Sequence, residues 1–127
     1  MRAADTNVLV RILVRDDDDQ TQAADSFVAE GAWVSLLVLQ ETIWVLERAY
    51  ALDRNEQGVI VDMLLQHATI ALEAPELVAS ALAVFRQSAK IEFSASLVLE
   101  VARRSGHLPL VTFDKRLAKT QGAELLR

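Results

Sequence analysis

The sequence predicts an α/β fold, in the form of a single-domain, three-layer α/β/α sandwich with a mainly parallel central sheet. Short apolar runs alternate along the chain with longer segments whose apolar residues recur at helical spacing. The hydrophobic fraction of 52% exceeds the roughly 45–50% of ordinary globular chains. A parallel sheet covered on both faces uses such a surplus. The 127 residues hold no repeat, linker or low-complexity stretch, so one domain is expected over 1–127.

Each expected element has its own signal. Strands are expected at residues 2–5, 32–35 and 69–72, near Ile91, and at 110–112. Helices are expected from Val8 to Leu13, from the Asp16–Asp19 run through Val28, over 36–50, 56–66, 75–88 and 94–105, and briefly after Asp114. Gly31 and Gly106 end two of these helices, and Pro75 suits the first turn of another. Strands that alternate with crossover helices are expected to be parallel.

Composition narrows the class of protein. There is no cysteine, which excludes disulfides and thiolate metal sites. No apolar run approaches the roughly 20 residues of a membrane span, and Asp5 comes too early for a signal peptide, so a cytoplasmic location is expected. The net charge of −5 argues against binding of nucleic acid by bulk basicity alone.

Two aspartates fall where a parallel sheet binds ligands. Asp5 ends the first expected strand and Asp114 follows the last one, and each begins a helix. Ligands of open parallel sheets bind beyond the carboxyl ends of the strands. An aspartate between a strand and a helix is also a common N-cap, so both interpretations stay open for each residue.

Glu41 lies in a strongly apolar helix. Its neighbours on the expected helix surface are Leu37, Trp44 and Val45, with Arg48 too far along the axis for a simple helix pair. A carboxylate there is costly unless it is paired with a cation or bound to a metal. Carboxylates are the oxygen ligands that Mg²⁺ and Mn²⁺ prefer, and such ions activate water for phosphodiester hydrolysis.

Three segments together resemble the PIN-domain family, and in order, spacing and length they resemble its VapC-type toxins. The segment Asp5-Thr6-Asn7-Val8-Leu9-Val10 is similar to the first motif of that family. Val38–Leu46 is similar to the second motif, whose acid corresponds to Glu41. Pro109–Ala118 is similar to the closing strand of the family and the acid that follows it.

The resemblance implies an endoribonuclease that uses Mg²⁺ or Mn²⁺, forms a homodimer and is held inactive by a VapB-type antitoxin. It assigns metal-site and catalytic roles to Asp5, Glu41 and Asp114. It implies a polar neighbour of that site in Thr112 and a hydrogen-bonding support in Asn7. The candidates for contact with RNA phosphates or antitoxin acids are Arg11, Arg15, Lys115 and Arg116, which are equally compatible with solvated surface.

The segment Glu92-Phe93-Ser94-Ala95-Ser96-Leu97 departs from the family pattern, which has a second aspartate, a principal metal acid, where this chain has Ala95. Glu92 keeps the charge of the first acid. Three explanations stay open: an engineered inactivation, natural loss of activity, and replacement by Glu92 from one helical turn away.

A second function class follows from the same departure. The chain is then a non-catalytic PIN-domain interaction module that binds an antitoxin-like partner. A phospho-receiver domain is a third small α/β class, but it needs an aspartate at the end of the third strand. Here Leu72 is followed by Glu73-Ala74-Pro75, which disfavours that class.

Overall fold

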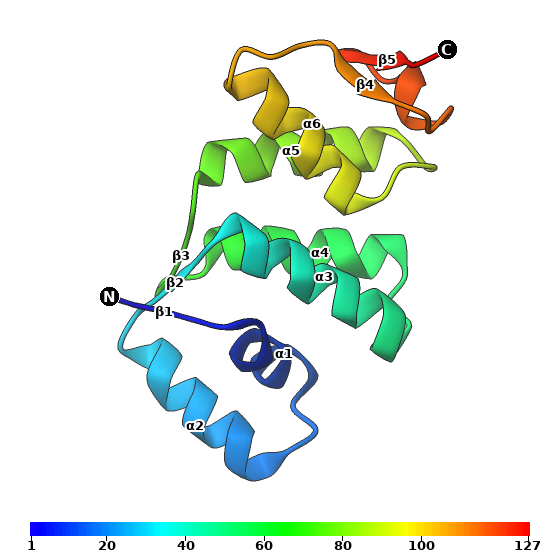
Figure 1. Cartoon of the computed structure of the whole chain (residues 1–127). Coiled ribbons are helices and arrows are strands. Elements are labelled where there is room, and N and C mark those ends of the chain that lie inside the picture. The colour runs from blue at the N-terminus through cyan, green and yellow to red at the C-terminus, as the bar shows by residue number, and fades with distance from the viewer. The chain divides into compact units, whose positions relative to one another are not determined.

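The computed structural model describes residues 1–127, which form two compact units, Met1–Pro75 and Glu76–Arg127. Helices alternate with short strands along the chain (Figure 1). Every strand pairing is parallel. The predicted α/β class with parallel strands is therefore confirmed. None of the helices has both the length and the apolar run that crossing a membrane requires.

The first unit contains a three-stranded sheet of order β1-β2-β3. Its strands are β1 (Arg2–Ala3), β2 (Ala32–Val34) and β3 (Ile70–Leu72), and Trp33 of β2 pairs with Ala71 of β3. Two helices connect each strand to the next: α1 (Thr6–Val14) and α2 (Asp18–Ala29), then α3 (Leu36–Tyr50) and α4 (Arg54–Gln66). These crossovers make the strands parallel, so the carboxyl ends of all three share one edge.

Capping residues define where these helices begin. The side chain of Ser35 accepts a hydrogen bond from the backbone N–H of Val38, and Asp53 and Glu56 form a reciprocal capping box at the start of α4. A polar residue just before an apolar run is a strong helix-start signal, which explains why the bounds 36–50 are correct.

The second unit contains α5 (Pro75–Gln87, whose first residue closes the first unit), α6 (Phe93–Arg104), β4 (Leu110–Thr112), a 3₁₀ turn η1 (Leu117–Lys119) and β5 (Ala123–Leu125). β4 and β5 form a second, two-stranded parallel sheet. The strand predicted near Ile91 is wrong: Ile91 lies in the loop between α5 and α6. Its apolar side chain is buried within the loop and does not belong to a strand.

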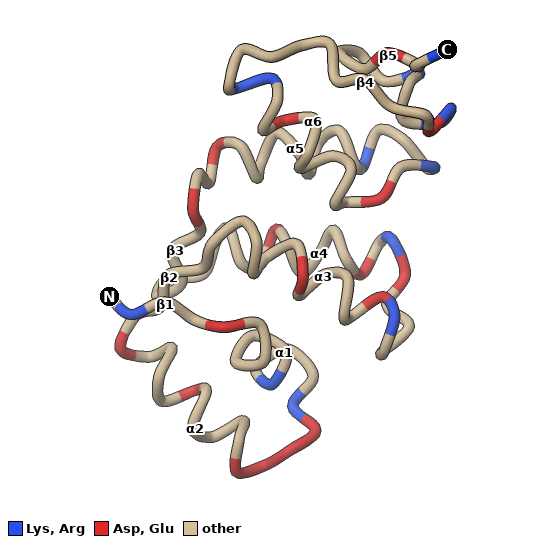
Figure 2. Tube along the Cα trace, viewed as in Figure 1, with Lys and Arg blue, Asp and Glu red and all other residues tan.

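Charge divides unevenly between the units (Figure 2). Residues 1–75 contain thirteen Asp and Glu against five Lys and Arg, whereas residues 76–127 contain five acids against eight bases. The net charge of −5 therefore describes neither unit. The second unit is basic.

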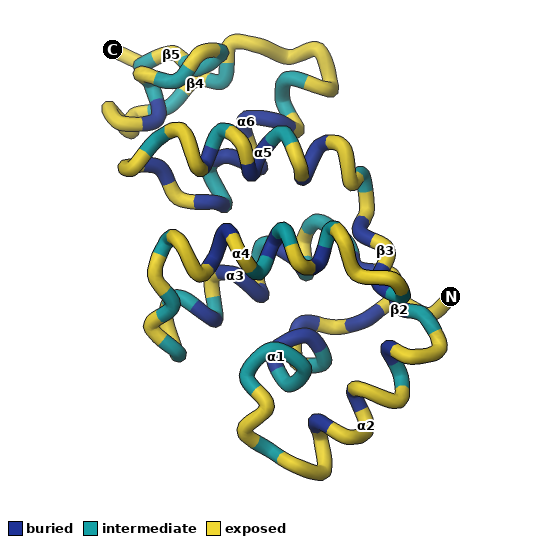
Figure 3. Tube along the Cα trace, turned by 180° about the vertical axis from the view of Figure 1, so that it is seen from behind, coloured by how far each residue is buried: buried dark blue, intermediate teal, exposed yellow.

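Each unit has its own apolar interior, seen as the dark blue stretches along the helices in Figure 3. In the first unit the fully buried side chains include Leu9, Leu39, Leu46 and Val61. In the second, the rings of Phe85 and Phe93 meet edge to face with centroids 5.7 Å apart. This contact joins the end of α5 to the start of α6 and fixes the loop between them.

Candidate metal-site acids and basic cleft

Asp5 lies at the carboxyl edge of the three-stranded sheet and is the N-cap of α1. Its Oδ1 accepts a hydrogen bond from the backbone N–H of Thr6 at 2.8 Å, and the residue is exposed. The local role is a helix cap, as one of the two interpretations requires. One carboxylate oxygen can serve the cap while the other faces solvent, so the cap does not prevent metal binding.

Glu41 is exposed on α3 and has no hydrogen bond or ion pair. The apolar residues beside it also face outward, since Leu37 is 81% exposed and Trp44 47% exposed. The expectation that Glu41 occupies a costly apolar environment is therefore wrong. The helix buries the opposite side, with Leu39, Ile43 and Leu46, and Glu41 lies well away from that stripe.

Asp114 follows β4 and organises the turn that leads to η1. Its Oδ1 accepts hydrogen bonds from the backbone N–H groups of Arg116 at 2.8 Å and Leu117 at 3.3 Å. The hydroxyl of Thr112 in turn accepts one from the N–H of Asp114 at 3.0 Å. Thr112 thus lies beside the candidate acid, and the exposed Asp114 carboxylate is fixed by its own loop.

Ala95 is half-buried in the first turn of α6, three residues after the N-cap residue Glu92. Glu92 is exposed and its side chain does not cap the helix. The buried hydroxyl of Ser96 donates to the carbonyl of Glu92 at 3.4 Å, so it is used within the helix. Neither neighbouring residue supplies a carboxylate at position 95.

Within each unit, no three His, Asp or Glu side chains lie together as a metal site would need. Asp5 and Glu41 belong to the first unit, and Glu92 and Asp114 to the second. All four are exposed carboxylates. In donor chemistry they fit Mg²⁺ or Mn²⁺, which bind carboxylate and water oxygens.

The four candidate cations divide into two kinds. Arg11 binds Asp16 at 2.8 Å, and Arg15 forms a two-pronged pair with Asp25 at 2.7 and 3.0 Å. The Arg15 hydrogen bonds hold the pKa of Asp25 below its usual value. These two arginines are engaged by acids of the same unit, whereas Lys115 and Arg116 have no acidic partner.

Asn7 lines a small hollow of about 300 Å³ between α1 and α2, which also contains Arg11 and the ring of Phe27. It makes no hydrogen bond to Asp5. Its role as a hydrogen-bonding support of the site stays a prediction.

Three features escaped the sequence analysis. Glu73, directly after β3, accepts a hydrogen bond from the backbone N–H of Leu36, and its place at the end of a strand was a usable signal. Glu100 is only 4% exposed on α6 and pairs with Arg103 at 3.4 Å. The third is a basic cleft in the second unit, which includes Lys115 and Arg116.

Comparison with known families decides the classification. The PIN-domain family model matches residues 3–123. The chain belongs to the PIN-domain family. PIN domains are in general metal-dependent nucleases, so this PIN domain has a nuclease-like fold. No curated protein matches the chain.

Proposed function

We propose that this PIN domain is a VapC-type toxin scaffold, a Mg²⁺- or Mn²⁺-dependent endoribonuclease whose own activity is impaired by Ala95. The observation that carries the proposal is the position of Asp5 and Asp114. In a chain matched by the PIN family over residues 3–123, each follows a parallel strand and begins the next helical segment.

Asp5, Glu41 and Asp114 are the proposed metal-site acids, with Glu92 as a weaker candidate. When bound, the ion would supply an activated water and neutralise charge at the scissile phosphate. The chain's own contribution is to present exposed carboxylates. Two of these, Asp5 and Asp114, are held by backbone N–H groups and so are oriented before any ion arrives.

The toxin assignment also implies partners. A VapB-type antitoxin would hold the domain inactive, two copies would form a homodimer, and the toxin would act on cytoplasmic RNA. The exposed apolar side chains on α3, Leu37 and Trp44, are of the kind that protein interfaces cover. Size-exclusion chromatography with light scattering, alone and with the antitoxin, measures both assemblies.

The decisive experiment restores the missing acid. Ala95→Asp should raise Mg²⁺- or Mn²⁺-dependent RNA cleavage by orders of magnitude, and EDTA should abolish it. Adding Glu41→Gln should remove the gained activity, whereas Glu47→Gln, on the same helix, should leave it. A folded, metal-binding Ala95→Asp variant that cuts no RNA would sink the ribonuclease proposal.

The alternative is a non-catalytic interaction module, and the specific observation in its favour is Ala95 itself. The side chain at position 95 offers no oxygen, and the hydroxyl of Ser96 is already used in a hydrogen bond to the carbonyl of Glu92. Under this alternative the antitoxin-like partner binds this chain tightly and Ala95→Asp gains no cleavage. An Asp codon at position 95 of the native gene would instead identify Ala95 as an engineered change.

A further inference from the structure

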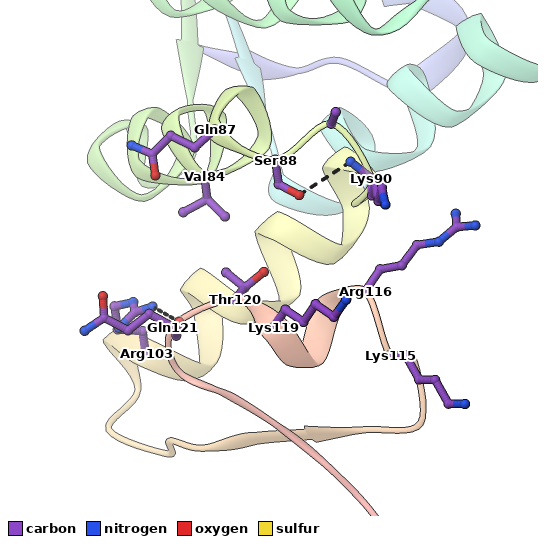
Figure 4. Close-up of a pocket in the computed structure, with 11 residues that line it drawn as sticks. Val84, Gln87, Ser88, Lys90, Arg103, Lys115, Arg116, Lys119, Thr120 and Gln121 are labelled. Carbon is purple, nitrogen blue, oxygen red and sulfur yellow. Dashed lines mark hydrogen bonds between the residues drawn. The ribbon is translucent and has the colours of Figure 1, made fainter.

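A cleft of about 560 Å³ lies within the second unit, in the region of the α5–α6 loop and η1 (Figure 4). Cations and uncharged residues line it. The cations are Lys90, Arg103, Lys115, Arg116 and Lys119, and the remaining lining residues are Val84, Gln87, Ser88, Ala89, Thr120 and Gln121. No acid lines it. Five of the thirteen Lys and Arg residues of an acidic chain therefore surround one cleft.

Four of these cations have no acidic partner. Lys90, Lys115, Arg116 and Lys119 form neither an ion pair nor a side-chain hydrogen bond. By contrast, three of the five arginines of the first unit, Arg2, Arg11 and Arg15, each pair with a nearby carboxylate. A cleft lined by one sign of charge concentrates the field and attracts ions of the opposite sign. The ligand that fits is an anion.

The fifth cation, Arg103, is structural. Its Nη2 donates to the carbonyl of Gln121 at 2.8 Å, which ties α6 to the segment after η1. Gly122, with φ +97°, packs against the same group, because an added Cβ would lie 2.9 Å from Nη2. One wall of the cleft is thus fixed, while the four free cations remain available.

The lining points to phosphates rather than to bases. No Phe, Tyr or Trp lines the cleft, and its only apolar side chains are Val84 and Ala89. Base recognition in single strands relies on stacking against aromatic rings, whereas phosphate contacts need only cations. Two lining residues, Lys115 and Arg116, directly follow Asp114 in the chain, and Oδ1 of Asp114 accepts a hydrogen bond from the backbone N–H of Arg116 at 2.8 Å.

We propose that this cleft binds the phosphodiester backbone of single-stranded RNA, without reading sequence, beside the bond that the proposed nuclease cuts. The choice of RNA as the ligand rests on the proposed function, whereas binding itself does not require that the chain cuts RNA. Binding needs neither a metal ion nor residue 95. The chain should hold RNA even while Ala95 impairs cleavage.

The test measures binding of a labelled single-stranded RNA to the unaltered chain in EDTA by fluorescence anisotropy, over about 50–200 mM salt. The double variant Lys115→Gln/Lys119→Gln should weaken binding by about tenfold. It should also lower the slope of log K against log salt by about 1.4, since each single-strand phosphate contact contributes roughly 0.7. The control Arg86→Gln/Arg104→Gln removes the same charge from the same unit outside the cleft and should change affinity less than about twofold.

Several results would overturn the proposal. One is equal weakening in both double variants, which would mean that only net charge matters. Another is tighter binding of inorganic pyrophosphate or a nucleoside triphosphate than of RNA, which would make the cleft a nucleotide site. A third is cleft-dependent binding of the acidic antitoxin with no RNA binding.

Failure of the cleft and failure of the proposed function give different results. If Ala95→Asp cuts RNA but Lys115→Gln/Lys119→Gln does not weaken RNA binding, only the cleft proposal fails. If the cleft binds RNA while Ala95→Asp cuts none, the ribonuclease proposal fails and the RNA-binding site stands.

Discussion

Oε1 of Glu73 accepts a hydrogen bond from the backbone N–H of Leu36 at 2.8 Å. The two residues are 37 positions apart in the chain, and the bond ties the end of β3 to the first turn of α3. A carboxylate at a helix N-terminus satisfies a backbone donor that has no partner within the helix and interacts favourably with the helix dipole. Glu73 therefore positions the helix that carries Glu41.

Replacing Glu73 by alanine should lower the free energy of unfolding by about 1 kcal/mol, because a helix cap is lost. Glu73→Gln keeps an acceptor oxygen and should cost less. Urea denaturation followed by circular dichroism measures both variants. No loss in Glu73→Ala would show that the bond to Leu36 contributes nothing, whereas equal losses in the two variants would assign the effect to the charge of the carboxylate.

Restoring a carboxylate at position 95 should change how the fold responds to metal. If residue 95 lies at the metal, Mg²⁺ or Mn²⁺ should raise the melting temperature of Ala95→Asp more than that of the unaltered chain. A metal concentration of about 100 Kd adds about 2.7 kcal/mol to the free energy of unfolding. For a chain of this size, each kcal/mol raises the melting temperature by roughly 3–6 °C. Ala95→Asn, similar in shape but uncharged, is the control, and equal metal-induced shifts in all three chains would remove residue 95 from the site.

The ion pair with Arg103 should offset the cost of burying the Glu100 carboxylate. Its side chain is 6% exposed, and Arg103 is its ion-pair partner. Arg103→Met should therefore lower the free energy of unfolding by about 1–3 kcal/mol, because a desolvated carboxylate is left without a cation. Adding Glu100→Gln should recover part of the loss. Denaturant titration of the two variants measures this, and no recovery would assign the loss to the Arg103–Gln121 bond instead.

The Arg15–Asp25 pair should make a small, pH-dependent contribution to stability. The hydrogen bonds from Arg15 lower the pKa of Asp25 in the folded chain. The contribution is therefore present above the ordinary aspartate pKa of about 3.9 and is lost as pH falls through the lower folded value. A double-mutant cycle with Arg15→Gln and Asp25→Asn, measured by urea unfolding from neutral to acidic pH, should show coupling that vanishes at the acid end. Coupling that grows toward low pH would contradict the assignment.

Elements with local signals could be predicted from the chain alone. The apolar run after Ser35 predicted α3 with its correct bounds, because the cap and the periodicity belong to the same segment. The strand Leu110–Thr112 was predicted from the alternation of short apolar runs with helical segments along the chain. The short strand Ala123–Leu125 was missed, because its pairing with β4, and not its own pattern, makes it a strand.

The surroundings of the charged side chains depend on tertiary packing. Glu41 faces solvent because packing buries the other side of α3, and Arg15 is engaged because α2 brings Asp25 to it. The basic cleft combines residues from Val84 to Gln121 that share no motif. The positions of Asp5 and Asp114 at strand ends can be predicted from the sequence, because the end of a strand and the start of the following helix are marked by neighbouring residues. Pairing, exposure and the cleft depend on which segments the fold brings together, and spacing along the chain does not encode that.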